Sequence, residues 1–394
     1  MNKKLLALAA GLCLTSTVQA ETPSLEQLWQ LVKDQQAEIE ALKSQIKDND
    51  IKTEATISAV EQFTVTPVKT SKTKIGGYGE VHYNNLENDN ATGTIDAVDF
   101  HRFVMFTGHQ FTDNIRFFSE LELEHSIAGE GKAGEIELEQ AYIEWDATEN
   151  LSAKAGLFLM PVGILNETHE PETFYGTERN NVEKNIIPAT WWEAGGAVSG
   201  ELLQGLSFDV AAHSGLYIAE GKYKPRDGRQ KVGKAKADNM AFTGRLKYTA
   251  IPGLELAASV QYQADVRQGE GASIDGTLFE THVAWQADDF QLRALYAQWE
   301  FDEVLNATKA GASEQNGFYI EPSYRLSENF GLFARYSHWD NTAGAQVDSK
   351  ISQIDLGVNY WLHRNVVFKF DYQNQDAPNG NGYDGINMGV GYSF

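Results

Sequence analysis

The chain has 394 residues, with 55 acidic and 32 basic side chains and a formal net charge of −23. This excess of acid argues against nucleic acid as a partner, because a phosphate backbone attracts basic surfaces. The 35 glycines and the aromatic content of 11% favour a β protein with many turns.

Residues 1–20 have the form of a secretory signal peptide. Lys3 and Lys4 precede the apolar run Leu5–Leu14, and residues 18–20 offer a small-residue cleavage site. Cleavage would remove Cys13, the single cysteine, so we expect no disulfide or thiol chemistry in the mature chain. It would also remove two lysines and no acids, which takes the net charge from −23 to about −25. No later segment has about 18 consecutive apolar residues, so no transmembrane helix is predicted.

Residues 21–66 are predicted to form a helical coiled coil and a linker. The seam, with its 3-4-3-4 spacing, comprises Leu25, Leu28, Val32, Gln35, Ile39, Leu42, Ile46 and Asn49. Polar Gln35 and Asn49 weaken this seam, and such residues often fix register or oligomeric state. The alternative is one amphipathic helix lying on its own domain. A polar linker, Thr64 to Lys74, leads to the following domain.

Residues 67–394 are predicted to form an all-β domain, a 16-stranded antiparallel transmembrane β-barrel. Strands of about ten residues match the span of a tilted membrane strand. Seven tight turns alternate with eight long loops; the turns lie near 112–114, 148–150, 203–205, 252–253, 288–289, 327–329 and 364–365. The loops lie near 85–97, 126–135, 160–192, 215–239, 266–276, 302–316, 340–350 and 375–384. Short turns at one end and long loops at the other are typical of outer-membrane barrels.

The last strand shows the alternation on which this prediction depends. Ile386, Met388, Val390, Tyr392 and Phe394 share one face, which suits lipid, and small or polar residues share the other. An aromatic carboxy-terminal residue fits a strand that closes a barrel against the first one. A soluble sandwich is the competing fold, but it would not need strands of such uniform length. In Val98–Gly108 both faces are apolar, so the orientation of that strand stays open.

The face assigned to the lumen carries both signs of charge. The basic candidates are Arg116, Lys154, Arg245, Lys247, Arg325, Arg335 and Lys369. The acidic candidates are Glu120, Glu122, Glu124, Asp209, Glu255, Glu280, Glu321, Asp355 and Asp371. A charge facing lipid would cost ~2–4 kcal/mol near the midplane, so these side chains must point inward whether or not they select solutes.

The longest loop, 160–192, is predicted to fold into the barrel and narrow the pore. Its apolar residues need a surface to bury against, and it follows the fifth strand, where sixteen-stranded porins place a constriction loop. We expect its acids to face basic wall residues across the pore and to set a transverse field. The predicted constriction residues are Glu167, Glu170, Glu172, Glu178, Arg116, Glu120, Lys154, Arg245, Arg325 and Arg335. The alternative is a loop packed over the mouth.

His169 lies close to Glu167, Glu170 and Glu172, but one histidine among exposed carboxylates is poor metal-ligand spacing, so no metal site is predicted. A second unusual loop carries seven basic residues between Lys222 and Lys236. This basic loop either gathers anions toward the pore or meets lipopolysaccharide phosphates. A merely solvated charged loop is the alternative.

Two segments resemble the phosphate-selective porin O/P family: the stretch from Phe100-His101-Arg102-Phe103 to Arg116–Glu124, and Gly156–Gly163. The resemblance extends over most of 74–394 and implies a trimeric sixteen-stranded channel. The helical extension before the barrel is similar to that of the dicarboxylate-porin group. Phosphate selectivity depends on a ladder of inward Arg and Lys, and here acids alternate with them.

The predicted protein is an outer-membrane porin of a Gram-negative bacterium. It allows passive diffusion of small hydrophilic solutes, anions among the candidates, without catalysis, cofactor or metal. Its expected partners are outer-membrane lipid, lipopolysaccharide and two further copies of the chain, as a homotrimer. The alternatives are a receptor or adhesin barrel with a closed lumen, or a barrel hydrolase, which would need a Ser–His pair at the lipid boundary.

Overall fold

The computed structural model describes residues 72–90 and 93–394. The predicted signal peptide, the coiled coil and most of the linker lie outside these residues. The strands are β1 (Thr73–Asn88), β2 (Thr94–Thr112), β3 (Ile115–Glu124), β4 (Ile136–Thr148), β5 (Leu151–Leu159), β6 (Trp192–Leu203), β7 (Leu206–His213), β8 (Ala241–Tyr248), β9 (Leu254–Gln263), β10 (Gly276–Ala287), β11 (Phe290–Phe301), β12 (Glu314–Ser327), β13 (Phe330–Asp340), β14 (Ile351–His363), β15 (Val366–Asp376) and β16 (Tyr383–Ser393).

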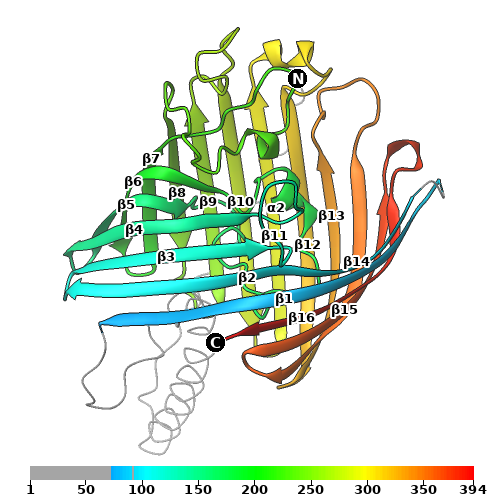
Figure 1. Ribbon diagram of the computed structural model, residues 1–394, viewed down its shortest axis with the longest axis horizontal. Helices are drawn as coiled ribbons and strands as arrows, with labels where there is room; N and C mark the ends of the chain where they lie inside the picture. Colours follow the sequence, from blue (N-terminus) through cyan, green and yellow to red (C-terminus); the bar gives the residue numbers. More distant parts are fainter. Residues whose placement is uncertain (1–71, 91–92) are drawn as a thin grey trace, which may run out of the picture. The chain divides into compact units, whose positions relative to one another are not determined.

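These strands form a closed antiparallel barrel in which each strand pairs with its neighbours in sequence (Figure 1). Closure comes from pairing of β1 with β16, in register from Tyr78 with Ser393 to Asn88 with Tyr383. Beyond that register, Gly77 and Phe394 exchange two backbone hydrogen bonds of 3.0 and 2.9 Å. The sixteen-stranded barrel predicted from the sequence is thereby confirmed, including the closing role of the last strand.

The connections alternate between tight turns and loops near the predicted places, but the first loop is shorter than the predicted 85–97, because β1 extends to Asn88 and β2 begins at Thr94. Pairs such as Asp288-Asp289, Glu328-Asn329 and Arg364-Asn365 join neighbouring strands directly. The described helices all lie in the long loops: α2 (Asn181–Asn185), η1 (Pro225–Gly228), η2 (Glu303–Ala307) and η3 (Pro378–Gly380). None of the helices in the described part of the chain is long and apolar enough to cross a membrane.

The two faces of the barrel separate as the alternation predicts. Side chains such as Phe279, Ile320, Leu356 and Phe370 are exposed on the outer face, where they suit lipid. Their sequence neighbours point inward and are mostly polar. This division leaves the charged residues of the strands inside the barrel, where they can contact loops and solutes.

The strand whose orientation the sequence left open contains a β-bulge. The pairing of β1 with β2 shifts by one residue between Glu80–Arg102 and His82–Asp99. Val98 is therefore exposed on the outside, whereas Arg102, Val104 and Phe106 are buried inside. An extra residue exchanges the two faces of a strand, which is why both faces of 98–108 read as apolar.

Candidate pore constriction

The segment between β5 and β6 lies inside the barrel rather than over its mouth. Its apolar side chains, including Ile186 and Trp191, join Trp299 and other inward residues of the wall in one buried cluster. The indole Nε1 of Trp299 on β11 donates to the carbonyl of Ile186 at 2.8 Å. Helix α2 packs against β12 and β13. Burial of these large side chains supplies the main stabilisation of the inward position.

Polar wall residues then fix the backbone of this inward loop (160–191). Arg102 on β2 donates to the carbonyl of His169 at 2.7 Å, and Arg293 on β11 donates to that of Thr173 at 2.7 Å. On β15, Asp371 accepts from the amide of Thr177 at 2.7 Å. These contacts come from separate parts of the barrel, so the loop extends across the lumen.

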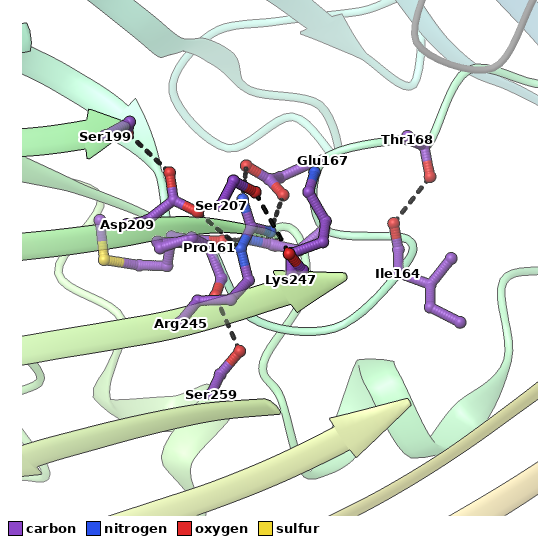
Figure 2. Close-up of polar contacts among 12 residues, drawn as sticks. Pro161, Ile164, Glu167, Thr168, Ser199, Ser207, Asp209, Arg245, Lys247 and Ser259 are labelled. Carbon is purple, nitrogen blue, oxygen red and sulfur yellow. Dashed lines mark hydrogen bonds and ion pairs between the residues drawn. The ribbon is translucent and has the colours of Figure 1, made fainter. Parts of the chain in front are cut away.

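Among the predicted constriction acids, Glu167 meets a wall arginine. It forms an ion pair with Arg245 on β8, and Arg245 also contacts Asp209 on β7 at 2.7 Å (Figure 2). Ser199 on β6 donates to Asp209 at 2.6 Å and holds that carboxylate in place. One guanidinium therefore lies between a loop acid and a wall acid.

Glu178 meets a histidine instead of an arginine. Its carboxylate lies 3.0 Å from Nδ1 of His82 on β1 and accepts from the amide of Asn84 at 3.0 Å. Burial raises the pKa of Glu178, but the hydrogen bond and charge of His82 outweigh it and hold this pKa well below its ordinary value. Glu178 is thus a fixed negative charge.

Glu170 and Glu172 are placed differently from the prediction. Glu170 is buried and Glu172 is half-buried, so neither is an exposed charge on the pore surface. Burial raises the pKa of Glu170 to about 7, and it also raises the pKa of Glu172. A carboxyl group in this position contributes less charge to a passing solute than an exposed one.

The predicted wall residues divide into those near the loop and those remote from it. Arg335 on β13 donates to the carbonyls of Tyr175 and Glu178, and it also pairs with Asp355 at 3.0 Å. Glu120 accepts from Gln140 at 2.7 Å, and its other oxygen approaches the loop. The ammonium of Lys154 lies over the rings of Tyr142 and Phe158, at 5.5 and 5.0 Å from their centroids.

Arg116 and Arg325 point inward, but their contacts lie near the turns and not at the loop acids that the prediction placed opposite them. Arg116 adjoins the β2–β3 turn, where it pairs with Glu144 at 2.9 Å and with Asp146. Arg325 adjoins the β12–β13 turn and stacks over Trp361, 3.7 Å from the ring centroid. The alternation places both arginines inside the barrel, but it does not give their height along the pore axis.

A cavity of about 340 Å³ lies beside the inward loop, and its charges are divided between loops and wall. Most of its basic side chains come from two loops (Arg179, Lys184, Arg226, Arg229 and Lys231), and Arg102 comes from the wall. Its wall acids come from β1, β3 and β4 (Glu80, Glu122, Glu124, Glu137 and Glu139), and the inward loop adds Glu178 and Glu183. The predicted polarity placed acids on the loop and bases on the wall, whereas at this cavity the cations lie mainly on the loops and acids lie on both sides.

Arg226 and Arg229 belong to the basic loop, for which the sequence left a role at the pore, at lipopolysaccharide or as a solvated loop open. Arg226 donates to the carbonyl of Ala189 at 2.7 Å, and Arg229 donates to that of Thr190, so this loop is bonded to the inward loop. Leu216 and Ile218, earlier in the same connection, are fully buried. Those two apolar residues were the available sequence signal that this segment packs inside.

Four of the basic residues that line the cavity, Arg179, Lys184, Arg226 and Arg229, make no ion pair within the described part of the chain, whereas Arg102 and Lys231 are paired with acids. Desolvation and the charges of Arg226 and Arg229 lower the pKa of Lys184, although Glu178 opposes the shift. Desolvation and the neighbouring Arg229 also lower the pKa of Arg226, to about 10. The cations thus repel one another, and an anion placed among them would relieve that repulsion.

A closed sixteen-stranded barrel with an apolar outer face and an inward loop is the architecture of an outer-membrane porin. The sequence profile of the family "Phosphate-selective porin O and P" matches residues 74–381. The chain therefore belongs to the phosphate-selective porin O and P family. It is an outer-membrane porin, and its pore allows passive diffusion of small solutes.

Individual relatives agree with this assignment. A protein of Aquifex aeolicus (strain VF5), described as uncharacterized, is 30% identical over 334 residues, which are 77% of this chain and 75% of that protein. The anion-selective porin of Comamonas acidovorans is similar in fold, with a TM-score of 0.59 and 13% identity over 82% of this chain and all of that one. The outer membrane channel DcaP of Acinetobacter baumannii has a TM-score of 0.57 and 12% identity over 84% of this chain and all of that one.

Proposed function

We propose that the pore favours small anions, and that its basic cluster of Arg179, Lys184, Arg226 and Arg229 forms the selective part of the constriction. The observation that carries this proposal is the pairing of charges. Arg245 and Arg335 are each paired with two carboxylates, so their charges are largely compensated. The four cluster cations have no carboxylate within ion-pair distance among the described residues, and they line the cavity.

The acids of β3 and β4 give the pore its second electrostatic wall. Glu137 is paired with Lys231, and Glu124 lines the same cavity. A solute between the two walls would experience a transverse field, which orients dipolar anions and slows neutral or apolar molecules. This arrangement supports a moderate preference for anions and not strict anion selectivity.

We further infer that the barrel acts without catalysis. One Ser–His contact does face outward: Nδ1 of His338 lies 3.2 Å from Oγ of Ser352. A hydrolase would also need a group that orients the histidine. His338 contacts no carboxylate among the described residues, and this favours a purely structural pair.

We also propose that the channel is a homotrimer in outer-membrane lipid, with residues 21–66 as an oligomerising helix. The regular seam from Leu25 to Ile46 supports this assignment. Lipopolysaccharide contact is assigned to the exposed lysines of the basic loop, such as Lys222.

The reversal potential in a salt gradient tests the anion preference. We expect the triple variant Lys184→Gln, Arg226→Gln and Arg229→Gln to shift the reversal potential toward cation preference. The matched control is Lys222→Gln, which removes an exposed charge from the same basic loop and should leave the potential nearly unchanged at 0.1 M salt, where charges are screened beyond ~10 Å. Equal potentials for the triple variant and the wild type would contradict the proposal.

A further inference from the structure

His169 of the inward loop faces two carboxylates of the barrel wall. Its Nε2 atom lies 3.5 Å from Oε1 of Glu120 on β3 and 3.5 Å from Oε2 of Glu139 on β4. All three side chains are at most 3% exposed. At this separation the contacts are longer than a good N–H···O hydrogen bond, and none of the three atoms has a hydrogen-bond partner.

The other ring nitrogen of His169 shows which way the imidazole is oriented. Nδ1 lies 3.2 Å from the carbonyl oxygen of Asn166. A carbonyl can only accept, so Nδ1 carries a proton and donates it. In the neutral ring, Nε2 then presents its lone pair to the two carboxylate oxygens. This is the arrangement of a metal-binding histidine, whose second nitrogen is usually held by a backbone carbonyl.

The surroundings of this cluster carry more negative than positive charge. Glu122 and Glu170 are buried nearby, and each has one oxygen without a hydrogen-bond partner. The adjacent cation, Arg102, is already bonded to Glu80 at 2.5 Å and to the carbonyl of His169. Buried carboxylates that face a lone pair are unfavourable unless a cation lies between them.

We propose that Glu120, Glu139 and His169 bind a divalent transition-metal ion, of which Zn²⁺ and Mn²⁺ fit best. One imidazole nitrogen with two carboxylate oxygens is a donor set for these ions, whereas Ca²⁺ takes six to eight oxygens. Gln140 donates to Oε2 of Glu120 at 2.7 Å and so directs Oε1 toward the site. Glu139 also lines the pore cavity, which gives the ion a path from the lumen.

The ion would fasten the inward loop to β3 and β4. The three ligands come from two neighbouring wall strands and from one loop position, so binding would restrict the loop directly. This role differs from that of the basic cluster, to which none of the three ligands belongs, although Glu139 also lines the cavity.

Metal content of the purified porin tests the site. Bound metal is removed from the protein with EDTA, and the protein is reloaded with Zn²⁺ or Mn²⁺ and dialysed. Its metal content is then measured by inductively coupled plasma mass spectrometry. We expect the wild type to retain one ion per chain, and His169→Gln and Glu139→Gln to lose it. Gln140→Ala should weaken binding by about 10- to 100-fold, as for other groups that orient a metal ligand.

A second cluster supplies the matched control. Asp99, His101 and His125 also lie within ligand distance of one another, but they are half-exposed. His125→Gln removes a ligand of that cluster and should retain the ion held by His169. Loss of the ion in His125→Gln, with retention in His169→Gln, would place binding at the exposed cluster and overturn the proposal.

A proton on Nε2 is the competing occupant. Burial lowers the pKa of His169, but the carboxyl groups of Glu120 and Glu139 outweigh it and raise this pKa well above its ordinary value. If the stripped wild type binds no more Zn²⁺ or Mn²⁺ than His169→Gln, a proton bridges the three groups and the metal proposal is wrong. Should His169→Gln fail to fold, thermal unfolding decides: added metal must stabilise the wild type and not Glu139→Gln, and equal shifts would overturn the proposal.

Discussion

Glu167 on the inward loop and Arg245 on β8 form an ion pair that joins the loop to the barrel wall. Asp209 on β7 contacts the same guanidinium, so removal of Arg245 would leave two acids facing each other. We expect Arg245→Gln to destabilise the barrel by about 3–5 kcal/mol, the usual cost of breaking a buried pair. Glu167→Gln should cost only about 1 kcal/mol, because an amide oxygen can still accept from Arg245.

Denaturant unfolding in lipid vesicles measures both effects. Glu149→Gln, in the exposed β4–β5 turn, is the control and should change nothing. Similar losses for Arg245→Gln and Glu149→Gln would show that this ion pair does not hold the loop.

The wall acids should oppose the basic cluster. We expect Glu124→Gln to raise the chloride-to-potassium permeability ratio about two- to ten-fold, because one negative charge less faces the cations across a narrow lumen. Reversal potentials measure this ratio. Glu130→Gln, at an exposed loop position, is the control, and an equal effect in both variants would place Glu124 outside the conducting path.

Anion preference should depend on pH through the basic cluster. Burial and the neighbouring arginines lower the pKa of Lys184 from its ordinary value of 10.5. Lys184 is a cation at neutral pH and loses its proton as pH rises through this lowered value, whereas the arginines of the cluster keep their charge. We therefore expect the anion preference to fall between neutral pH and the ordinary lysine pKa of 10.5, and to fall less in Lys184→Gln. An equal dependence of the reversal potential on pH in the wild type and Lys184→Gln would place Lys184 outside the pore.

The helix predicted for residues 21–66 gives a separate prediction about assembly. Deletion of residues 21–60 should weaken the proposed trimer without abolishing the barrel, since the barrel strands begin at Thr73. The trimer-to-monomer transition on heating in detergent measures this change. An unchanged transition would assign the helix a role other than oligomerisation.

The partners of the four acids in the long loop could not be predicted from the sequence. All four belong to one segment, and the prediction treated them as one group facing the pore. In the structure Glu167 meets Arg245, Glu178 meets His82, and Glu170 is buried. The burial and the partner of each glutamate depend on which wall strand it reaches, and the composition of the loop does not contain that information.

His169 shows the same limit of the sequence, here for a proposed metal site that the sequence argued against. Its neighbours in sequence are poor metal partners, so the local spacing argued against a site. The carboxylates that face it come from Glu120 and Glu139, on β3 and β4. A search for ligands close in sequence cannot find a site whose donors are brought together by a folded loop.

The sequence by itself determined the barrel. The alternation of side chains and the order of turns and loops are local properties, and each strand pairs with its neighbours in the chain. The uniform strand length expected from the sequence is not observed, since β7 and β8 have 8 residues each and β2 has 19. Only the tertiary structure decided which charges meet inside. Glu178 and His82 are 96 residues apart, and their contact depends on how the inward loop packs against β1 within a closed lumen. The alternation gives the direction of a side chain, but packing gives its height along the pore and its partner.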